Sequence, residues 1–425
     1  MCVVEDENGE TSVEARLPRR ARAAYDRLLR AFVRPPRATY DAAQLGPARF
    51  EFGGSSYARR DDSCVNGRGQ AVRYSAWRRV RAAARKGDGE KRPTRTLVYL
   101  HGNASSRVEA LGSLSLALTL GFDVLAPDCA GSGVSDGAHV SLGWHERDDV
   151  VALLARERSL GRDLGAVALW GRSMGAATAV LYAATRDPDV SALVLDSAFS
   201  SLRQLSFDVA KRGAAAVPGP IVGAALRWVR GSVLGLADFD LYDVAPLDHA
   251  PEVASPALVL CAADDVFVEP AHSHAIHAAL GCVDKELCVC PGAHNTARPI
   301  GAYVSIEGFL RRALGDGEAK TAFADVVDRR LAILLSPARR PDRPNFAALP
   351  PWTVENLTIR ARQRERPIDD FAEADDVSEA SADDGAAAAA DAPTTPRWLR
   401  EEAAPAHDDT VAAMQEETAR VARLP

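Results

Sequence analysis

The feature that most constrains the fold of this chain is a regular alternation of two hydrophobic patterns between residues 96 and 314. Short apolar runs of strand length, such as residues 96–100 and 190–195, alternate with longer stretches that are apolar at helical spacing, such as residues 105–120 and 141–160. Strands that are connected through helices pair in parallel, and the helices cover both faces of the resulting sheet. The pattern therefore predicts an α/β fold built on a mostly parallel sheet.

One turn in this alternation carries a chemical signal. Residues 170–175 read Trp-Gly-Arg-Ser-Met-Gly, after an apolar strand run and before an alanine-rich helical run. A serine flanked at both second neighbours by glycine, on a strand-to-helix turn, is the pattern of a nucleophile elbow. The turn is tight and strained, so a Cβ atom at either glycine would clash, and the helix N-terminus stabilises negative charge near the serine. Ser173 is therefore a candidate nucleophile.

A serine nucleophile needs a base, and the base needs an acid that orients it. In this architecture the chain order is serine, acid, histidine, each at the carboxyl end of a strand. Asp264 and Asp265 follow the strand run that ends at residue 261, and His294 follows the run that ends at residue 290. We favour Asp264 as the acid, with Asp265 as the alternative and Asp196, after an earlier strand, as a third candidate.

Two backbone N–H groups should face the oxyanion of the transition state. One is that of Met174, which follows the candidate nucleophile. The other is predicted in the loop His101-Gly102-Asn103-Ala104, directly after the first strand of the alternation, where Gly102 allows a close approach of the backbone and Asn103 presents its N–H. The sequence thus predicts an oxyanion hole from Asn103 and Met174.

These segments, together with residues 128–137 and 292–295, resemble the α/β-hydrolase fold superfamily. Within it they are most similar to the serine aminopeptidase-like domain and to the depalmitoylase-type α/β-hydrolase-domain-containing proteins. The resemblance covers about residues 50–315 and implies an eight-stranded, mostly parallel sheet and hydrolysis of an ester or thioester. The chain departs from the family at Cys261, where the family usually has glycine, and it lacks the cysteine-rich N-terminus of the depalmitoylases.

Three regions are predicted along the chain. Residues 1–48 form an N-terminal helical extension, and residues 49–315 form the hydrolase domain. The alternation is interrupted at residues 202–251, a mostly helical and apolar segment placed where a short cap over the site would lie. Residues 316–425 carry prolines, pairs of aspartates and an alanine tract, a composition that buries too little apolar surface to fold, and form a mostly disordered acidic tail.

Composition excludes several other functions. The net charge of −7 argues against a nucleic-acid partner, which would require a basic surface. No apolar run has membrane-spanning length, and no targeting segment is recognised, so we expect a cytoplasmic protein with peripheral membrane association left open. The seven cysteines follow no disulfide framework and are expected to be free thiols. His272, His274 and His277 are expected on a solvated helix face rather than at a metal, and no cofactor is predicted.

The sequence therefore predicts a cofactor-independent serine hydrolase that forms an acyl-enzyme. The short cap favours a small-molecule or acyl-protein ester or thioester of modest size as substrate. Two alternatives stay open. One is an aminopeptidase-type amide hydrolase, suggested by the resemblance, and the other is a non-catalytic protein that keeps the fold as a binding scaffold.

Overall fold

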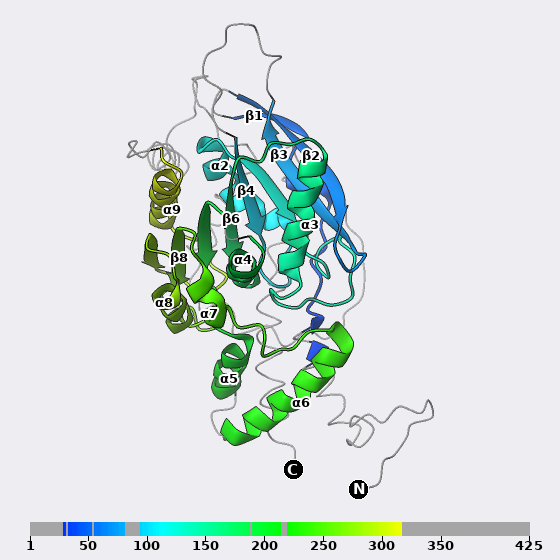
Figure 1. The fold of residues 1–425 in the computed structure, drawn as a ribbon, viewed down its shortest axis with the longest axis vertical. Helices are drawn as coiled ribbons and strands as arrows, with labels where there is room; N and C mark the ends of the chain where they lie inside the picture. The colour runs from blue at the N-terminus through cyan, green and yellow to red at the C-terminus, as the bar shows by residue number, and fades with distance from the viewer. Residues whose placement is uncertain are drawn as a thin grey trace, which may run out of the picture.

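The computed structural model describes residues 29–316, apart from residues 31–32, 53–54, 81–93, 188 and 214–218 (Figure 1). Most of the predicted N-terminal extension and nearly all of the predicted tail lie outside the described residues. The described part of the chain is a central sheet with helices on both faces, and two further helices lie at one end of the molecule (Figure 1).

Within the described part of the chain the sheet has nine strands, in the order β1-β2-β3-β5-β4-β6-β7-β8-β9. The strands from β5 to β9 in this order are parallel, and β1, β2 and β3 are joined to them by antiparallel pairing. The strands are β1 (Arg49–Phe52), β2 (Ser55–Val65), β3 (Ala71–Arg79), β4 (Arg95–Leu100), β5 (Asp123–Pro127), β6 (Ala166–Arg172), β7 (Ala192–Asp196), β8 (Ala257–Ala262) and β9 (Lys285–Cys290).

The predicted fold class is confirmed, but the predicted count of eight strands is wrong. At the N-terminal edge of the sheet, Phe52 of β1 pairs with Ser55 of β2 in an antiparallel hairpin, and β1 is the outermost strand. Residues 53 and 54, between these two strands in the sequence, are both glycine.

Helices cover the two faces of the sheet. The α-helices are α2 (Leu111–Thr119), α3 (Glu146–Ser159), α4 (Met174–Thr185), α5 (Leu202–Gly213), α6 (Gly219–Ala237), α7 (Pro246–His249), α8 (Pro270–Ala279) and α9 (Ile300–Ala313). Short 3-10 helices are η2 (Ala42–Leu45), η3 (Arg107–Ala110) and η4 (Ala250–Glu252). The helix expected over residues 105–120 therefore starts as the 3-10 turn η3, capped by the Ser106 side chain, before it continues as α2.

The sheet divides the hydrophobic core into two clusters. Leu97 and Tyr99 of β4 face the cluster that contains α2 and α9 side chains, whereas Val98 and Leu100 face the cluster of α3, α4 and α8. Successive residues of a strand point to opposite faces, so a strand that is buried on both faces must be apolar throughout. This explains the continuous apolar runs from which the parallel strands were predicted.

Helices α5 and α6 interrupt the alternation between β7 and β8 and form, with residues 238–251, the segment that we call the cap. Val222, Leu226, Val229 and Val233 line the buried side of α6 at helical spacing. They belong to a third apolar cluster that also contains Met174 at the start of α4. The cap therefore packs over the turn that carries Ser173.

Two further observations concern the described residues alone. None of their helices combines the length and the apolar character that a membrane span requires. Their cysteines are all free thiols, and Cys288 is the one that is partly accessible.

Candidate active site

Ser173 lies at the junction of β6 and α4 in a strained backbone conformation, with φ 50° and ψ −113°. A non-glycine residue at positive φ is uncommon and points to a position that the surrounding structure enforces. The two flanking glycines explain how the turn closes. A Cβ atom added at Gly171 would lie 2.1 Å from the carbonyl oxygen of Gly175, and one added at Gly175 would lie 2.0 Å from that of Leu100. Both positions therefore require glycine, as the sequence indicated.

The structure brings Ser173 and His294 together from 121 residues apart. His294 Nε2 lies 3.1 Å from Ser173 Oγ. His294 Nδ1 lies 2.7 Å from Oδ2 of Asp265. The other oxygen of Asp265 accepts hydrogen bonds from the backbone N–H groups of Phe267 and Val268, at 2.9 and 2.8 Å. Ser173, Asp265 and His294 are 5%, 3% and 4% exposed, so the array is almost fully shielded from solvent.

The carboxylate that contacts the imidazole is therefore that of Asp265, and the preference for Asp264 is corrected. Asp264 accepts a hydrogen bond from the backbone N–H of Gly292 at 3.1 Å, and its side chain is exposed. The two neighbours point to different sides because the chain turns directly after β8, where the Asp265 N–H bonds to the carbonyl of Ala262. The third candidate, Asp196, lies within reach of neither imidazole nitrogen and is paired with Arg298.

The two residues predicted to supply oxyanion donors flank Ser173. Met174 is the first residue of α4, so its N–H has no acceptor within the helix. The loop of Asn103 passes close by, since a Cβ atom added at Gly102 would lie 3.9 Å from the Cβ of Ser173. The Asn103 side chain accepts the N–H of Ala104, a residue held at φ 56°. His101 anchors the loop, because its Nε2 accepts a hydrogen bond from the N–H of Cys129 and its Nδ1 bonds to the Gly102 carbonyl.

Charged residues that the sequence did not single out surround the array. Arg172 lies 3.5 Å from Glu109, and Arg298 forms a paired contact with Asp196. Burial opposes the ionisation of Glu109, but the Arg172 charge and hydrogen bonds to its carboxylate outweigh it and lower the pKa of Glu109 to about 2. The nearby Asp196 raises the pKa of Arg298 against the effect of burial.

One of the three histidines of α8 differs from the expectation of a solvated face, whereas His274 is exposed and His277 is half-buried. His272 is buried, and its Nδ1 accepts hydrogen bonds from the N–H and hydroxyl of Ser200 at 3.2 and 2.8 Å. Its Nε2 lies 3.2 Å from Asp208 of the cap helix α5. The sequence could not show this because the partners come from two other elements. No group of three or more His, Cys, Asp or Glu side chains in the described ranges is arranged to hold a metal ion.

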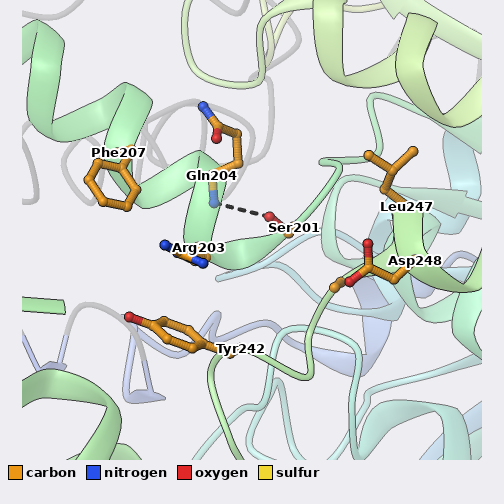
Figure 2. Close-up of a pocket in the computed structure, with 8 residues that line it drawn as sticks. Ser201, Arg203, Gln204, Phe207, Tyr242, Leu247 and Asp248 are labelled. Carbon is orange, nitrogen blue, oxygen red and sulfur yellow. Dashed lines mark hydrogen bonds between the residues drawn. The ribbon is translucent and has the colours of Figure 1, made fainter. Parts of the chain in front are cut away.

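A hollow of about 460 Å³ lies at the base of the cap and is separate from Ser173 (Figure 2). Arg203 stacks over the ring of Tyr242, at 5.1 Å from its centroid, and Phe207 lies on the other side of the guanidinium (Figure 2). Ser173, Asp265 and His294 do not line it. The hollow is therefore a feature of the cap and separate from the candidate active site.

The sheet order and the elbow define a class of protein, and the comparison with known families agrees with them. The family model described as the alpha/beta hydrolase fold matches residues 95–219 of this chain. The match and the mostly parallel, helix-covered sheet together support the α/β-hydrolase fold for this chain, and this fold supports hydrolysis as its class of reaction.

Individual relatives are distant. The chain is 27% identical over 183 residues to the uncharacterised protein YqkD of Bacillus subtilis, a match that covers 41% of this chain and 56% of YqkD. The chain thus spans little more than half the length of this relative. Among solved structures it is similar to the esterase Pf2001 of Pyrococcus furiosus, with 19% identity, coverage of 65% of this chain and 98% of that one, and a TM-score of 0.47. It is also similar to the mouse alpha/beta hydrolase domain-containing protein 10, with 16% identity, coverage of 61% and 100%, and a TM-score of 0.45.

Proposed function

We propose that this protein is a serine hydrolase that cleaves an ester or thioester through Ser173, His294 and Asp265. The observation that carries the proposal is the pair of contacts made by one imidazole, 3.1 Å to the Ser173 hydroxyl and 2.7 Å to the Asp265 carboxylate. A carboxylate oxygen at this distance accepts a hydrogen bond from the ring, so Asp265 selects the tautomer of His294 with the proton on Nδ1. Nε2 is then free to accept the proton of the serine.

In the proposed reaction, Ser173 Oγ attacks the carbonyl carbon of the substrate as its proton moves to His294 Nε2. The carbonyl oxygen becomes an oxyanion, which accepts hydrogen bonds from the N–H groups of Met174 and Asn103, and each such donor contributes roughly 3 kcal/mol to transition-state stabilisation. Collapse of the tetrahedral intermediate breaks the bond to the alcohol or thiol, which takes the proton from His294. Water then attacks the acyl carbon as its proton moves to the same nitrogen, and the bond to Ser173 Oγ breaks as His294 returns that proton to Oγ, which releases the acid.

The environment of the array favours this chemistry. The three side chains are almost fully buried, and a charge–charge interaction is stronger in a site from which water is excluded. The ring of Phe267 packs edge-on against the imidazole of His294, with 5.1 Å between centroids, and restricts its rotation. A developing imidazolium is therefore held against the Asp265 carboxylate.

The test is labelling by a fluorophosphonate probe together with a panel of p-nitrophenyl esters and acyl thioesters of graded chain length. We expect labelling of the wild type and its loss in Ser173→Ala, with turnover reduced by about 10⁴-fold or more. The matched control is Ser200→Ala, which removes the other serine hydroxyl that contacts a buried imidazole and should retain labelling. A folded wild type that is not labelled would favour the non-catalytic scaffold, and faster turnover of aminoacyl amides than of esters would favour the aminopeptidase.

A further inference from the structure

Two arginines hold the backbone of the loop that carries His294. The Nη2 of Arg172 donates to the carbonyl oxygen of His294 at 2.6 Å. The Nη1 of Arg298 donates to the carbonyl oxygen of Ala293 at 3.1 Å. This loop connects β9 to α9. The carbonyl of Ala293 also accepts from the N–H and the hydroxyl of Thr296, at 3.3 and 3.0 Å. The two guanidinium groups thus add side-chain hydrogen bonds at consecutive peptide groups of this loop.

Each arginine is fixed in turn by a carboxylate. Arg298 contacts both oxygens of Asp196 through Nε, at 3.0 Å each, and through Nη2 at 2.7 Å, and Nη2 also donates to Ser197 Oγ at 2.8 Å. Arg172 lies 3.5 Å from Glu109. The side chains of Arg298 and Asp196 are 6% and 7% exposed. A planar guanidinium that is held at both ends in a buried site has one orientation, which a flexible ammonium group would not have.

The two acidic residues, Asp196 and Glu109, also contact the other parts of the site. The carbonyl oxygen of Asp196 accepts the N–H of Ser173 at 2.7 Å. The Glu109 carboxylate accepts the N–H of Gly102 at 3.1 Å, in the loop that presents Asn103. Arg172 itself directly precedes Ser173. The nucleophile turn, the histidine loop and the candidate oxyanion loop are therefore joined by one continuous polar network.

We propose that Arg172 and Arg298 are positioning residues that set the distance and angle between His294 and Ser173. The proposal rests on the proposed function and extends it, since neither arginine contacts the reacting atoms. A displacement of about 1 Å between reacting groups can cost about 100-fold in rate, so a loop without secondary structure requires such anchoring. Because each guanidinium is balanced by a carboxylate, the network supplies hydrogen-bond donors near His294 without a net positive charge that would oppose the imidazolium.

The test compares Arg172→Lys and Arg298→Lys with a matched control, Arg78→Lys. Arg78 of β3 pairs with the buried Glu157 at 2.6 Å. This pair lies near the start of β5, at the amino ends of the parallel strands and away from the carboxyl ends that carry the site. Lysine keeps the charge at all three positions and removes the fork of donors. We expect kcat and the fluorophosphonate labelling rate to fall by about 10- to 100-fold in the two site variants, with KM within about threefold. Arg78→Lys should keep the wild-type kcat.

A second readout separates positioning from a general loss of stability. Arg298→Ala leaves a space of the size of a guanidinium ion beside the Asp196 carboxylate. We expect millimolar guanidinium, but not ammonium or potassium, to restore part of the activity of Arg298→Ala and to leave that of Arg78→Ala unchanged. No restoration of a folded Arg298→Ala, together with wild-type kcat in both lysine variants, would overturn the proposal.

The third readout does not depend on turnover. The proton shared by His294 Nδ1 and Asp265 should give a downfield proton NMR signal, assigned by its loss in His294→Gln. We expect the signal in the wild type and in Arg78→Lys, and its loss or broadening in Arg298→Lys. An unchanged signal in Arg172→Lys and Arg298→Lys would contradict positioning even if no substrate were found. Failure of the proposed function would instead appear as an unlabelled wild type.

Discussion

The interactions that stabilise the sheet edge around Ser173 differ in kind from those that stabilise the cap above it. At the sheet edge, the loops are joined by directed contacts between buried polar groups, such as Ser173 N–H to Asp196 and Asp265 to His294. In the cap, the buried side of α6 is fixed by aliphatic contacts, and its outer side exposes Trp228, Leu234 and Leu236 at 45%, 51% and 50%.

We expect this difference to make the sheet edge geometrically fixed and the cap more tolerant of small movements. A hydrogen bond fixes both distance and angle, whereas aliphatic burial is not directional and tolerates small shifts of one element over another. The directed contacts between cap and core include Asp208 with His272, and Arg212 with Glu269 at 3.2 Å. We therefore expect substitutions at the sheet edge to act on geometry and rate, and substitutions in the cap to act weakly on stability.

The largest effect should separate the two neighbouring aspartates. Asp265→Asn keeps the shape of the side chain but no longer selects the Nδ1–H tautomer of His294, and we expect kcat to fall by about 10⁴-fold. Asp264→Asn is the matched control, because Asp264 contacts only the backbone of Gly292 at the loop, and its activity should stay within a few-fold of wild type. Steady-state kinetics on the best ester of the panel measures both. Equal losses would contradict the assignment of the acid.

The next effect concerns packing at the elbow. Gly175→Ala places a Cβ atom 2.0 Å from the Leu100 carbonyl and 2.8 Å from that of His101. Backbone cannot move away without displacing β4, so we expect a loss of about 3 kcal/mol or more in the free energy of unfolding, measured by urea denaturation. A loss below about 1 kcal/mol would show that the elbow is less tightly packed than its contacts indicate.

A third effect depends on pH and compares a fully buried carboxylate of the core, Asp149, with a partly buried one of the cap, Asp240. Burial raises the pKa of Asp149 to about 7, although the N–H of Ala130 and the amide of Asn66 donate to it. Between about pH 4 and pH 7 the folded protein keeps a proton that the unfolded chain releases. This stabilisation is complete at low pH and is lost as the pH rises to 7, by about 2 kcal/mol between pH 5 and pH 7.

Asp149→Asn should abolish that slope in denaturation curves recorded from pH 5 to pH 8. The cap offers the control, since Arg230 donates to Asp240 and lowers its pKa. A lowered pKa adds stability only above the unfolded pKa of Asp, about 4, so this term is already complete at pH 5. The curves of Asp240→Asn should therefore run parallel to those of the wild type, and a slope that survives in Asp149→Asn would assign the pH dependence to another group.

The smallest effect should have the opposite sign. Gly231 lies within α6, where an added Cβ atom would meet nothing within 4 Å. Alanine favours a helix over glycine, so Gly231→Ala should stabilise the protein by about 0.5–1 kcal/mol with unchanged activity. Thermal and urea unfolding would measure it. A destabilisation would mean that the outer side of α6 is more constrained than that of a solvent-facing helix.

The sequence predicted those parts of the site that depend on where strands end. Ser173 and His294 each follow an apolar run, and the glycines around Ser173 have a local steric cause, so both could be proposed from the sequence, and the structure brings them into contact. The choice between Asp264 and Asp265 depends on the rotation of the chain after β8, which no periodicity encodes. Asp265 was considered and ranked second for that reason.

The polar network was beyond prediction for a related reason. Arg172 and Glu109 lie 63 positions apart and form no motif, and Arg298 meets Asp196 only after the sheet has formed. The fold itself was predictable because the inner parallel strands, such as β4, β7 and β8, are buried on both faces and are recognisable as apolar runs. The edge strand β1 was missed because an antiparallel hairpin leaves no such run.

The backbone of the elbow also restricts which chemistry evolution can place there. With φ at 50°, residue 173 occupies a conformation in which a side chain branched at Cβ is severely crowded. Threonine, although it carries the same hydroxyl, is therefore shut out of this position, whereas cysteine fits. The fold can exchange an oxygen nucleophile for sulfur in a single step, but a secondary alcohol would require the turn itself to be rebuilt.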